Sequence, residues 1–482
     1  MQKVIPCFYS EYGRYISRFR AIPLFIDGLK PVERRLLLSL KEKGSKKFQK
    51  SAKIIGHCMG EYHPHGDQSI YGSLVDMVKR ELAQGEGNWG IEGLENDNAA
   101  AMRYTETRSQ PWVNELAFTY CNKNYMKWEE LELEEEPLFL PSPLPIGLIG
   151  HGIITGISFD TTTIPRYSRE DLKNRLIWLI NNESNYQQVR QIDLDSDDVD
   201  VTLLGPIVKP NIRNCTTFER ESNAYHKLLI HGEGSIQIVP NGNIDSKTKR
   251  VHINGKSPLR HGFKNLARKC DGVDKNGKPI PKDKKIPGKI KDLSKTSCDV
   301  VIFPDKPRSQ DLNQLATQVW GIISPTISFN CQFCDLDGKL YKLGIDQLLL
   351  TSYKYWKTTV NNKKVYEINR LYNTLFELHI IHYVRQMNLT GMATIDDIIT
   401  QFNKNTYQPV QLETFDTKNN VWQQYTKSIT EQDVRDVCSR KSIKQLIEVS
   451  IDFQKINQKI SDTKTSIQNN DQECFQYLQS IS

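Results

Sequence analysis

The sequence lacks the long apolar runs that mark a membrane protein. None of its 482 residues lies in a run approaching the ~18 apolar residues that a bilayer-spanning helix needs. The first six residues also lack the apolar stretch of a secretory signal. From these absences we expect a soluble, cytoplasmic protein with no membrane partner.

Paired cysteines and nucleotide-binding loops are also scarce. The ten cysteines are scattered, and only Cys331 and Cys334 have a C-x-x-C spacing, without a second pair at zinc-ribbon distance. We therefore expect reduced thiols. No Walker-type glycine-rich loop for ATP occurs in the sequence. The acidic run 193–198 lacks the apolar strand and the glycines that accompany a D-x-D metal site, so a solvated loop is favoured over a metal site.

Charge is nearly balanced over the whole chain. The 64 Lys and Arg residues exceed the 57 Asp and Glu residues by seven, which permits a nucleic-acid partner without requiring one. The segment 264–295 concentrates lysine, interrupted by glycine and proline. It is interpreted as a solvated insertion, with a contact to the DNA backbone as the alternative.

The first 160 residues predict a helix-turn-helix arrangement. Pro31 begins an apolar helical pattern that ends near Gly44, with proline and glycine in their usual places at the two ends. A short helix is predicted over 52–59 and a longer one over 68–82, with Asp67 as its N-cap. Basic residues flank both, which is typical of a winged-helix or helix-turn-helix module.

The remainder of the chain changes character twice. Between about 160 and 355, β-like runs alternate with helical stretches, as in an α+β domain; the runs are 199–204, 235–239, 251–253 and 299–303. From about 360, apolar residues follow a helical repeat in two separated stripes: Val365, Ile368, Tyr372, Leu375, His379 and His382, then Leu446, Phe453 and Ile460. Two long helices around a smaller helical region predict an antiparallel coiled-coil arm, with two ordinary core helices as the alternative.

The stretch from Ala99 to Arg108 carries the candidate chemistry. A phenol with a pKa near 10 is a poor nucleophile at neutral pH, so Tyr104 needs neighbouring cations before it can attack a phosphodiester. Arg103 is permanently charged and adjacent. The product would be a phosphotyrosine diester, which conserves the energy of the broken bond.

Four motifs make the chain resemble the A-type, DNA-cleaving subunit of type IIA DNA topoisomerases, the family of DNA gyrase and topoisomerase IV. Their order and spacing match the family; they are Arg20–Pro23 with Asp27–Arg35, Lys50–Gly56 with Tyr62–Asp67, Gly85–Gly90, and Ala99–Glu106. A weaker echo lies at 150–156. The layout is closest to the separate DNA-cleaving subunit of T4-like phage topoisomerases.

The resemblance implies roles for individual residues. Tyr104 matches the nucleophile and Arg103 its neighbouring cation. Further residues match positions that bind DNA, some around the scissile phosphate: Arg20, Lys30, Arg34, Arg35, Lys53, His63 and His65. Either histidine is also a candidate for shuttling the tyrosine proton or holding the leaving 3′-oxygen, although a capped turn alone would explain the His-Pro-His sequence. Ile153 matches an apolar wedge inserted between base pairs, with a core position as the alternative.

The resemblance also implies an architecture and partners. The fold is expected to be α+β and multidomain: a winged-helix domain at 1–160, an α+β tower at 161–355, and a coiled-coil arm with a helical C-gate dimerisation region at 356–482. Double-stranded DNA is the expected substrate and a homodimer the expected assembly. Mg²⁺, held by a TOPRIM fold, and ATP would come with a partner subunit. The chain ends soon after the second arm helix, which favours relaxation or decatenation over supercoiling.

Three positions depart from the family pattern. Glu33 stands where a basic residue is usual, and Gln68 and Gly72 replace the serine and the acidic residue that carry quinolone contacts in bacterial relatives. Weak quinolone sensitivity is therefore expected. A phage-type cleaving subunit has three alternatives: a gyrase or topoisomerase IV A subunit of cellular origin, a non-catalytic winged-helix DNA-binding protein, and a structural coiled-coil scaffold.

Overall fold

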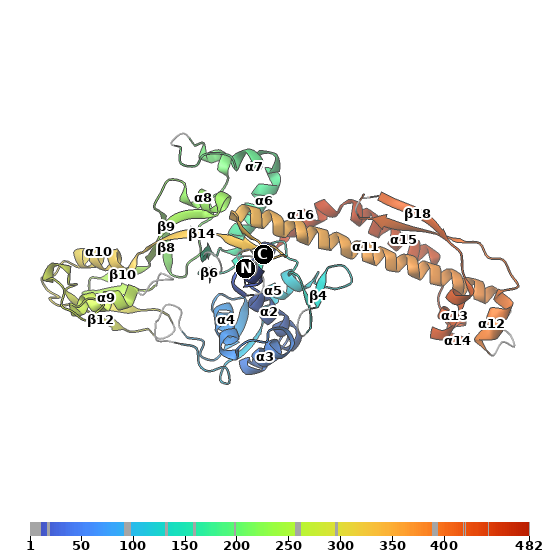
Figure 1. Cartoon of the computed structure of the whole chain (residues 1–482), viewed down its shortest axis with the longest axis horizontal. Coiled ribbons are helices and arrows are strands. Elements are labelled where there is room, and N and C mark those ends of the chain that lie inside the picture. The colour runs from blue at the N-terminus through green and yellow to red at the C-terminus, as the bar shows by residue number, and fades with distance from the viewer. Residues whose placement is uncertain are drawn as a thin grey trace, which may run out of the picture. The chain divides into compact units, whose positions relative to one another are not determined.

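The computed structural model divides the chain into two compact units (Figure 1). Unit 1 comprises Met1–Cys121, Lys127–Trp356 and Ile481–Ser482, and unit 2 comprises Asn122–Met126 and Lys357–Ser480. The structure describes residues 11–16, 20–90, 98–130, 134–157, 161–196, 199–255, 262–294, 297–387, 394–417, 419, 421–441 and 443–481. Both units mix helices and strands or hairpins, so the predicted α+β class is confirmed at that level.

The N-terminal part of unit 1 is a helical core with a small antiparallel sheet. Its helices are α2 (Pro31–Lys43), α3 (Ser51–His57), the π-helical turn η2 (Cys58–Tyr62) and α4 (Asp67–Lys79). The sheet has the strand order β1-β3-β2, formed by β1 (Gln49–Lys50), β2 (Ala83–Glu86) and β3 (Glu106–Ser109). These elements share one apolar core, which includes Leu36, Leu40, Ile54, Leu74 and Met77.

Helix α2 begins and ends as its sequence predicts. Pro31 occupies the first turn, and the backbone N–H of Gly44 donates to the carbonyl of Leu40 at the other end. The carboxylate of Glu33 accepts from the backbone N–H of Lys30 at 2.9 Å, which satisfies one of the free donors at the helix start. The prediction for α4 was wrong at one residue: Gly66 is the N-cap, and Asp67 is the first helical residue.

Short elements then lead to a larger antiparallel sheet in unit 1. The short elements are α5 (Pro111–Val113), η3 (Asn114–Phe118), β4 (Trp128–Glu130), β5 (Glu135–Pro137) and η4 (Ile146–Leu148). The sheet has the strand order β6-β7-β14-β9-β8, formed by β6 (Ile153–Ile157), β7 (Thr161–Pro165), β8 (Cys215–Glu219), β9 (Glu233–Pro240) and β14 (Thr326–Asn330). Strands β6 and β7 pair with each other, so a boundary placed at residue 160 falls between two partners of one sheet. The helices that accompany it are α6 (Arg169–Asn181), α7 (Glu183–Val189) and α8 (Ala224–His231).

A four-stranded sheet of unit 1 carries the lysine-rich segment. Its strand order is β10-β11-β13-β12, formed by β10 (Gly242–Asp245), β11 (Arg250–Ile253), β12 (Gly288–Asp292) and β13 (Val300–Pro304). Helices α9 (Gly262–Asp271) and α10 (Leu312–Ile323) bury apolar side chains with these strands, and η6 (Lys282–Lys284) lies between α9 and β12. The described part of 264–295 is therefore folded, with Leu266, Cys270 and Ile286 in the core. β15 (Gln332–Cys334) and β16 (Leu340–Lys342) form a hairpin before the long helix α11 (Ile345–Gln386).

Unit 2 contains most of α11 and the elements that follow it. These are α12 (Ile395–Phe402), β17 (Val410–Asp416), β18 (Val421–Lys427), α13 (Glu431–Arg440), α14 (Ile443–Glu448), α15 (Phe453–Gln468) and α16 (Asn470–Ser480). The predicted stripe on α11 is confirmed at Val365, Ile368, Tyr372 and Leu375, which are buried in the unit 2 core. The β17–β18 hairpin lies in a region predicted to be helical.

Two predicted elements differ from the structure for identifiable reasons. Residues 199–204 were predicted as a strand, but η5 (Val201–Leu204) is a 3₁₀ turn, because the Asp200 carboxylate accepts from the backbone N–H of Thr202 at 3.0 Å. The second arm stripe was predicted on one long helix, but α14 and α15 are separate. Arg385 donates to the carbonyl of Leu446 at 2.6 Å, and Asp452 caps the start of α15 through the backbone N–H of Lys455.

Candidate active site

Tyr104 is exposed to solvent, whereas the residues that hold the adjacent backbone are buried. Its side chain is 64% exposed, whereas the next residue, Thr105, is fully buried. The Thr105 hydroxyl donates to the hydroxyl of Ser51 at 2.8 Å, and the backbone N–H of Ser51 donates to the Thr105 carbonyl at 2.9 Å. The Tyr71 hydroxyl donates to the carbonyl of Ala100 at 2.5 Å. The chain is thus fixed on both sides of Tyr104 while its phenol remains open to solvent.

Arg103 supplies positive charge directly beside this phenol. Its guanidinium carbon lies 4.6 Å from the centre of the Tyr104 ring. A guanidinium keeps its charge at any physiological pH, and stacking on the ring places that charge close to a phosphate that reaches the hydroxyl. The predicted pairing of the two residues is therefore present within one chain.

A second cluster forms around His63, at the end of η2. The Arg35 guanidinium makes two hydrogen bonds to the Glu136 carboxylate, from Nε to Oε2 at 2.8 Å and from Nη2 to Oε1 at 3.1 Å. Its third nitrogen, Nη1, lies 2.8 Å from Nδ1 of His63. The rings of His63 and His65 meet edge to face with their centres 4.3 Å apart. The structure thus brings three predicted site residues, Arg35, His63 and His65, into one corner.

The protonation state of His63 follows from its surroundings. Its side chain is buried, and burial, followed by the positive charges of Arg35, His65 and Arg20, lowers its pKa to about 3. His63 is therefore neutral at pH 7. It cannot contribute a positive charge, as the resemblance had suggested for this basic cluster, but it can donate a hydrogen bond. His65 and Arg20 are exposed.

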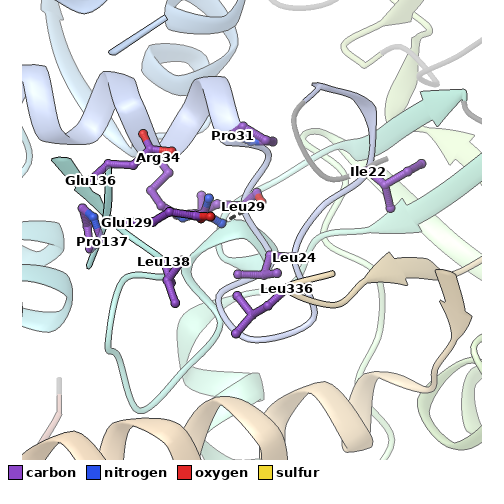
Figure 2. Close-up of a pocket in the computed structure, with 10 residues that line it drawn as sticks. All are labelled: Ile22, Leu24, Leu29, Pro31, Arg34, Glu129, Glu136, Pro137, Leu138 and Leu336. Atoms are coloured by element: carbon purple, nitrogen blue, oxygen red, sulfur yellow. Dashed lines mark hydrogen bonds between the residues drawn. The ribbon is translucent and has the colours of Figure 1, made fainter. Parts of the chain in front are cut away.

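Arg34 is buried against an aspartate. Its Nε and Nη2 donate to the two oxygens of Asp27 at 2.9 and 3.0 Å, and the side chains are 7% and 0% exposed. Asp27 also accepts from the backbone N–H groups of Leu29 and Leu140. Figure 2 shows Arg34 beside a hollow that is otherwise lined by Ile22, Leu24, Leu29, Pro31, Glu129, Glu136, Pro137, Leu138 and Leu336. In this arrangement Arg34 holds the loop before α2, and a direct contact with DNA remains a prediction.

Lys30 connects the start of α2 to strand β6. Its ammonium donates to the carbonyl of Thr155 at 2.6 Å. Burial lowers its pKa, and Arg166 and Arg80 add to this, while Glu33 and Asp76 oppose it. The close packing here extends to the backbone, since a side chain on Gly147 would meet the carbonyl oxygen of Gly28 at 1.8 Å. Lys30 is thus oriented toward the strand that carries Ile153.

Glu33, the departure from the family pattern, belongs to a charge network that joins the buried Arg80 and Arg166 to Asp76, whose side chain is 53% exposed. The Glu33 carboxylate pairs with Arg80 at 2.5 Å, and Arg80 and Arg166 also pair with Asp76, each at 3.2 Å. Loss of part of its hydration works against the ionisation of Asp76, but Arg80 and Arg166 outweigh this effect and lower its pKa. Arg166 also donates to the carbonyls of His151 and Ile153 at 3.5 Å. The network therefore supports the turn that leads into β6.

The remaining predicted residues lie apart from these clusters. Lys53 is exposed and donates to Gln49 at 2.9 Å. Ile153 is half-buried and faces Pro165 in the β6–β7 pair. Across the described ranges, no hydrogen bond or ion pair joins Tyr104 to the His63 cluster of the same chain.

Comparison with known proteins identifies the family. Residues 20–479 match the family of DNA gyrase/topoisomerase IV A subunits. The chain belongs to this family. It is 26% identical over 413 residues to the A subunit of the chloroplastic/mitochondrial DNA gyrase of Nicotiana benthamiana, covering 82% of the chain and 41% of the relative. It is 26% identical over 444 residues to the A subunit of DNA topoisomerase 4 from Bacillus subtilis, covering 88% and 50%.

A shorter match has higher identity. The A subunit of DNA gyrase from Aminobacterium colombiense is 36% identical over 196 residues, which is 38% of the chain and 23% of the relative. The chain spans half or less of the length of these curated relatives. The resemblance to the gyrase/topoisomerase IV A family that the four motifs indicated is confirmed.

Several residues that shape the site in this family member were not singled out by the sequence motifs. Asp27, Ser51 and Thr105 lie within the quoted motifs, so the motifs could have identified them as site residues. Glu136 gave no signal, because it stands in a run of acidic residues in which any member would look like a solvated face. Its role depends on Arg35, which is 101 residues away in the sequence.

The acidic run 193–198 and the Cys331–Cys334 pair were the sequence's candidates for metal binding. Among the described residues, no group of three or more His, Cys, Asp or Glu side chains is placed to hold a metal ion together. In the acidic loop, Asp195 pairs with Lys227 at 2.5 Å. Cys331 and Cys334 are buried free thiols, and burial raises the pKa of both, that of Cys334 to about 12. No helix in the described ranges has the length and apolar character required to span a membrane.

Proposed function

We propose that the chain is the DNA-cleaving and religating subunit of an ATP-dependent type IIA DNA topoisomerase. The observation that carries this proposal is the exposed Tyr104 phenol with the Arg103 guanidinium over its ring, held by the buried contacts of Thr105. A solvent-facing phenol on a fixed backbone suits attack on a large polymer. Membership of the gyrase/topoisomerase IV A family supports the proposal of a DNA-cleaving subunit.

In the proposed reaction, the Tyr104 oxygen forms a bond to the DNA phosphorus, and the bond from phosphorus to the 3′-oxygen breaks. The phenolic proton is lost and the leaving 3′-oxygen gains one, so the step is balanced. Arg103 stabilises the negative charge that builds up on the phosphate. The resulting 5′-phosphotyrosyl diester keeps the bond energy, and the reverse attack by the 3′-hydroxyl reseals the strand.

The same proposal assigns architecture and assembly. Two chains form a homodimer through winged-helix and C-gate interfaces, so that two copies of Tyr104 open both strands for passage of a second duplex. We assign the winged-helix domain to 1–160, the tower to 161–355, and the coiled-coil arm with its C-gate to 356–482. The helix pair α3 and α4 with the β1-β3-β2 sheet supports the first assignment, and the length of α11 supports the last.

A partner subunit completes the enzyme in this proposal. It brings the ATPase and the TOPRIM fold, whose Mg²⁺ supplies electrostatic stabilisation when bound. We place the protein in the cytoplasm, that of the host cell if the chain is phage-encoded. A phage-type layout is part of the proposal.

The test is a plasmid assay with the partner subunit captured from source cells. The proposal expects ATP-dependent relaxation or decatenation without net negative supercoiling. The second candidate function, that of a gyrase-type A subunit, is favoured by the gyrase names of the relatives. Negative supercoiling in the presence of ATP would select that candidate. DNA binding without any strand passage would select a non-catalytic DNA-binding protein and overturn the proposal.

A further inference from the structure

The contact between Arg35 and His63 determines which nitrogen of the histidine carries its proton. An arginine guanidinium has N–H donors and no acceptor, so Nη1 must donate the 2.8 Å hydrogen bond and Nδ1 of His63 must accept it. Nδ1 is then without a proton, and the neutral ring carries its proton on Nε2. A doubly protonated ring would turn an N–H toward an N–H, which this geometry does not allow.

Glu136 prevents Arg35 from turning away. Its two carboxylate oxygens hold Nε and Nη2, which leaves Nη1 directed at His63. The side chains of Arg35 and Glu136 are 7% and 11% exposed, so water does not compete effectively for the pair. The His63 backbone is fixed as well, because its N–H donates to the carbonyl of Cys58 at 2.7 Å.

We propose that Glu136 and Arg35 are positioning residues that lock His63 in its neutral form with the proton on Nε2, so that His63 serves strand cleavage as a hydrogen-bond donor and not as a base or a cation. This inference rests on the proposed function for its catalytic part. A base must accept a proton at a free nitrogen, but Nδ1 is occupied by Arg35 and Nε2 already carries hydrogen. The Nε2–H group suits an oxygen that gains negative charge, such as a phosphate oxygen or the leaving 3′-oxygen.

The other groups around the ring favour the same state. His65 lies against the ring from the same turn, and Arg20 adds positive charge. The Glu136 carboxylate lies near His63, but it accepts its hydrogen bonds from Arg35. The pKa of His63, lowered to about 3, agrees with the hydrogen-bond geometry. The positive charge needed for catalysis then comes from groups such as Arg103.

Nuclear magnetic resonance of the full chain with nitrogen-labelled histidine tests the lock without an activity assay. His63→Gln assigns the signal among the ten histidines. The wild-type signal is expected to show Nε2 protonated, Nδ1 unprotonated, and no titration between pH 5.5 and 8. A titration near the ordinary pKa of about 6.5, or a proton on Nδ1, would overturn the inference.

Substitutions of Arg35 and Glu136 test whether these residues set the protonation state of His63. Arg35→Met alone would leave Glu136 buried without its cation, so the double variant Arg35→Met/Glu136→Gln removes both charges together. Nδ1 of His63 then loses its donor, so a population with the proton on Nδ1 is expected, and the pKa of His63 is expected to rise while burial still holds it below its ordinary value. Lys43→Met removes an exposed cation from the same helix α2 and should leave the signal unchanged. A proton that stays on Nε2 alone, with an unchanged pKa, would show that Arg35 and Glu136 do not set the protonation state of His63.

A cleavage assay with the partner subunit tests the donor role. The amide nitrogen of glutamine reaches the place of Nε2, whereas that of asparagine reaches only the place of Nδ1. His63→Ala and His63→Asn are expected to lose about 100-fold in cleavage rate, as for other lost donors, and His63→Gln much less. Equal losses for all three would overturn the donor role. If the wild type forms no covalent complex with DNA, the proposed function fails, while the resonance experiment still decides the protonation state.

Discussion

The Glu33 carboxylate and the Arg80 guanidinium form an ion pair of 2.5 Å in which the side chains are 6% and 1% exposed. Glu33→Gln is expected to destabilise the protein by about 3 kcal/mol, because removing one partner of a buried pair leaves the other charge uncompensated. Thermal unfolding and denaturant titration would measure this. Glu115→Gln, at an exposed position, serves as the control and should change stability by less than about 0.5 kcal/mol. An equally small effect of Glu33→Gln would show that Asp76 alone satisfies Arg80.

Acid should weaken the folded state through His63. Its pKa falls from about 6.5 in the unfolded chain to about 3 in the folded protein, chiefly through burial. Between these values only the unfolded chain binds the proton, so the free energy of unfolding falls by about 1.4 kcal/mol per pH unit as pH decreases. His63→Gln should therefore reduce the loss of stability between pH 6.5 and 5 by about 2 kcal/mol. The exposed His65 gives the control, and His65→Gln should leave most of that loss in place.

Two glycines in the N-terminal core should respond to alanine in opposite directions. Gly72 lies inside α4, and a side chain there would meet nothing within 4 Å, so Gly72→Ala should stabilise the helix by about 0.5–1 kcal/mol. At Gly85, a Cβ atom would lie 2.4 Å from Nε1 of Trp89, so Gly85→Ala should destabilise by about 1–3 kcal/mol. Unfolding midpoints of the two variants check the pair. A stabilising Gly85→Ala would mean that Trp89 moves freely.

Drug sensitivity should follow the two departures on α4. Wild-type cleavage and religation are expected to resist an ordinary fluoroquinolone, because Gln68 and Gly72 lack the side chains that bind it in bacterial relatives. Gln68→Ser/Gly72→Asp should increase drug-stabilised cleavage at least tenfold, a change of about 1.4 kcal/mol in binding. Gly72 has open space for the new side chain, and Gln68 is exposed. Nanomolar inhibition of the wild type would contradict the expectation.

The parts of the fold that sequence predicts well are those with local causes. Helix α2 carries its own start and stop at Pro31 and Gly44, and strand β9 has the alternation of a half-buried strand. The 199–204 run fails as a strand because Asp200 offers the backbone a competing hydrogen bond. The single second arm helix fails because Arg385, 61 residues earlier, takes the carbonyl of Leu446. Neither event changes the apolar pattern that was used for the prediction.

In the candidate site, too, contacts between sequence neighbours could be predicted, and contacts between distant residues could not. Tyr104 and Arg103 are adjacent in sequence, so their pairing could be predicted. The resemblance treated His63 as one of several basic residues, whereas burial and Arg35 keep it neutral. Arg34 and Arg35 carry the same charge in the motif, but Asp27 and Glu136 hold both inside the protein. Such long-range pairs depend on the packed structure and leave no pattern in the sequence.

The most direct test of the central claim is to trap the reaction in progress. The chain with its partner subunit would be incubated with DNA labelled on the 3′ side of the break, in the fragment that gains the 5′-phosphate link, and then denatured, digested and analysed by mass spectrometry. The account predicts a nucleotide joined through its 5′-phosphate to Tyr104, absent in Tyr104→Phe and unchanged in Tyr425→Phe, which alters another exposed tyrosine. A covalent link at a different residue, or cleavage that persists in Tyr104→Phe, would contradict the account.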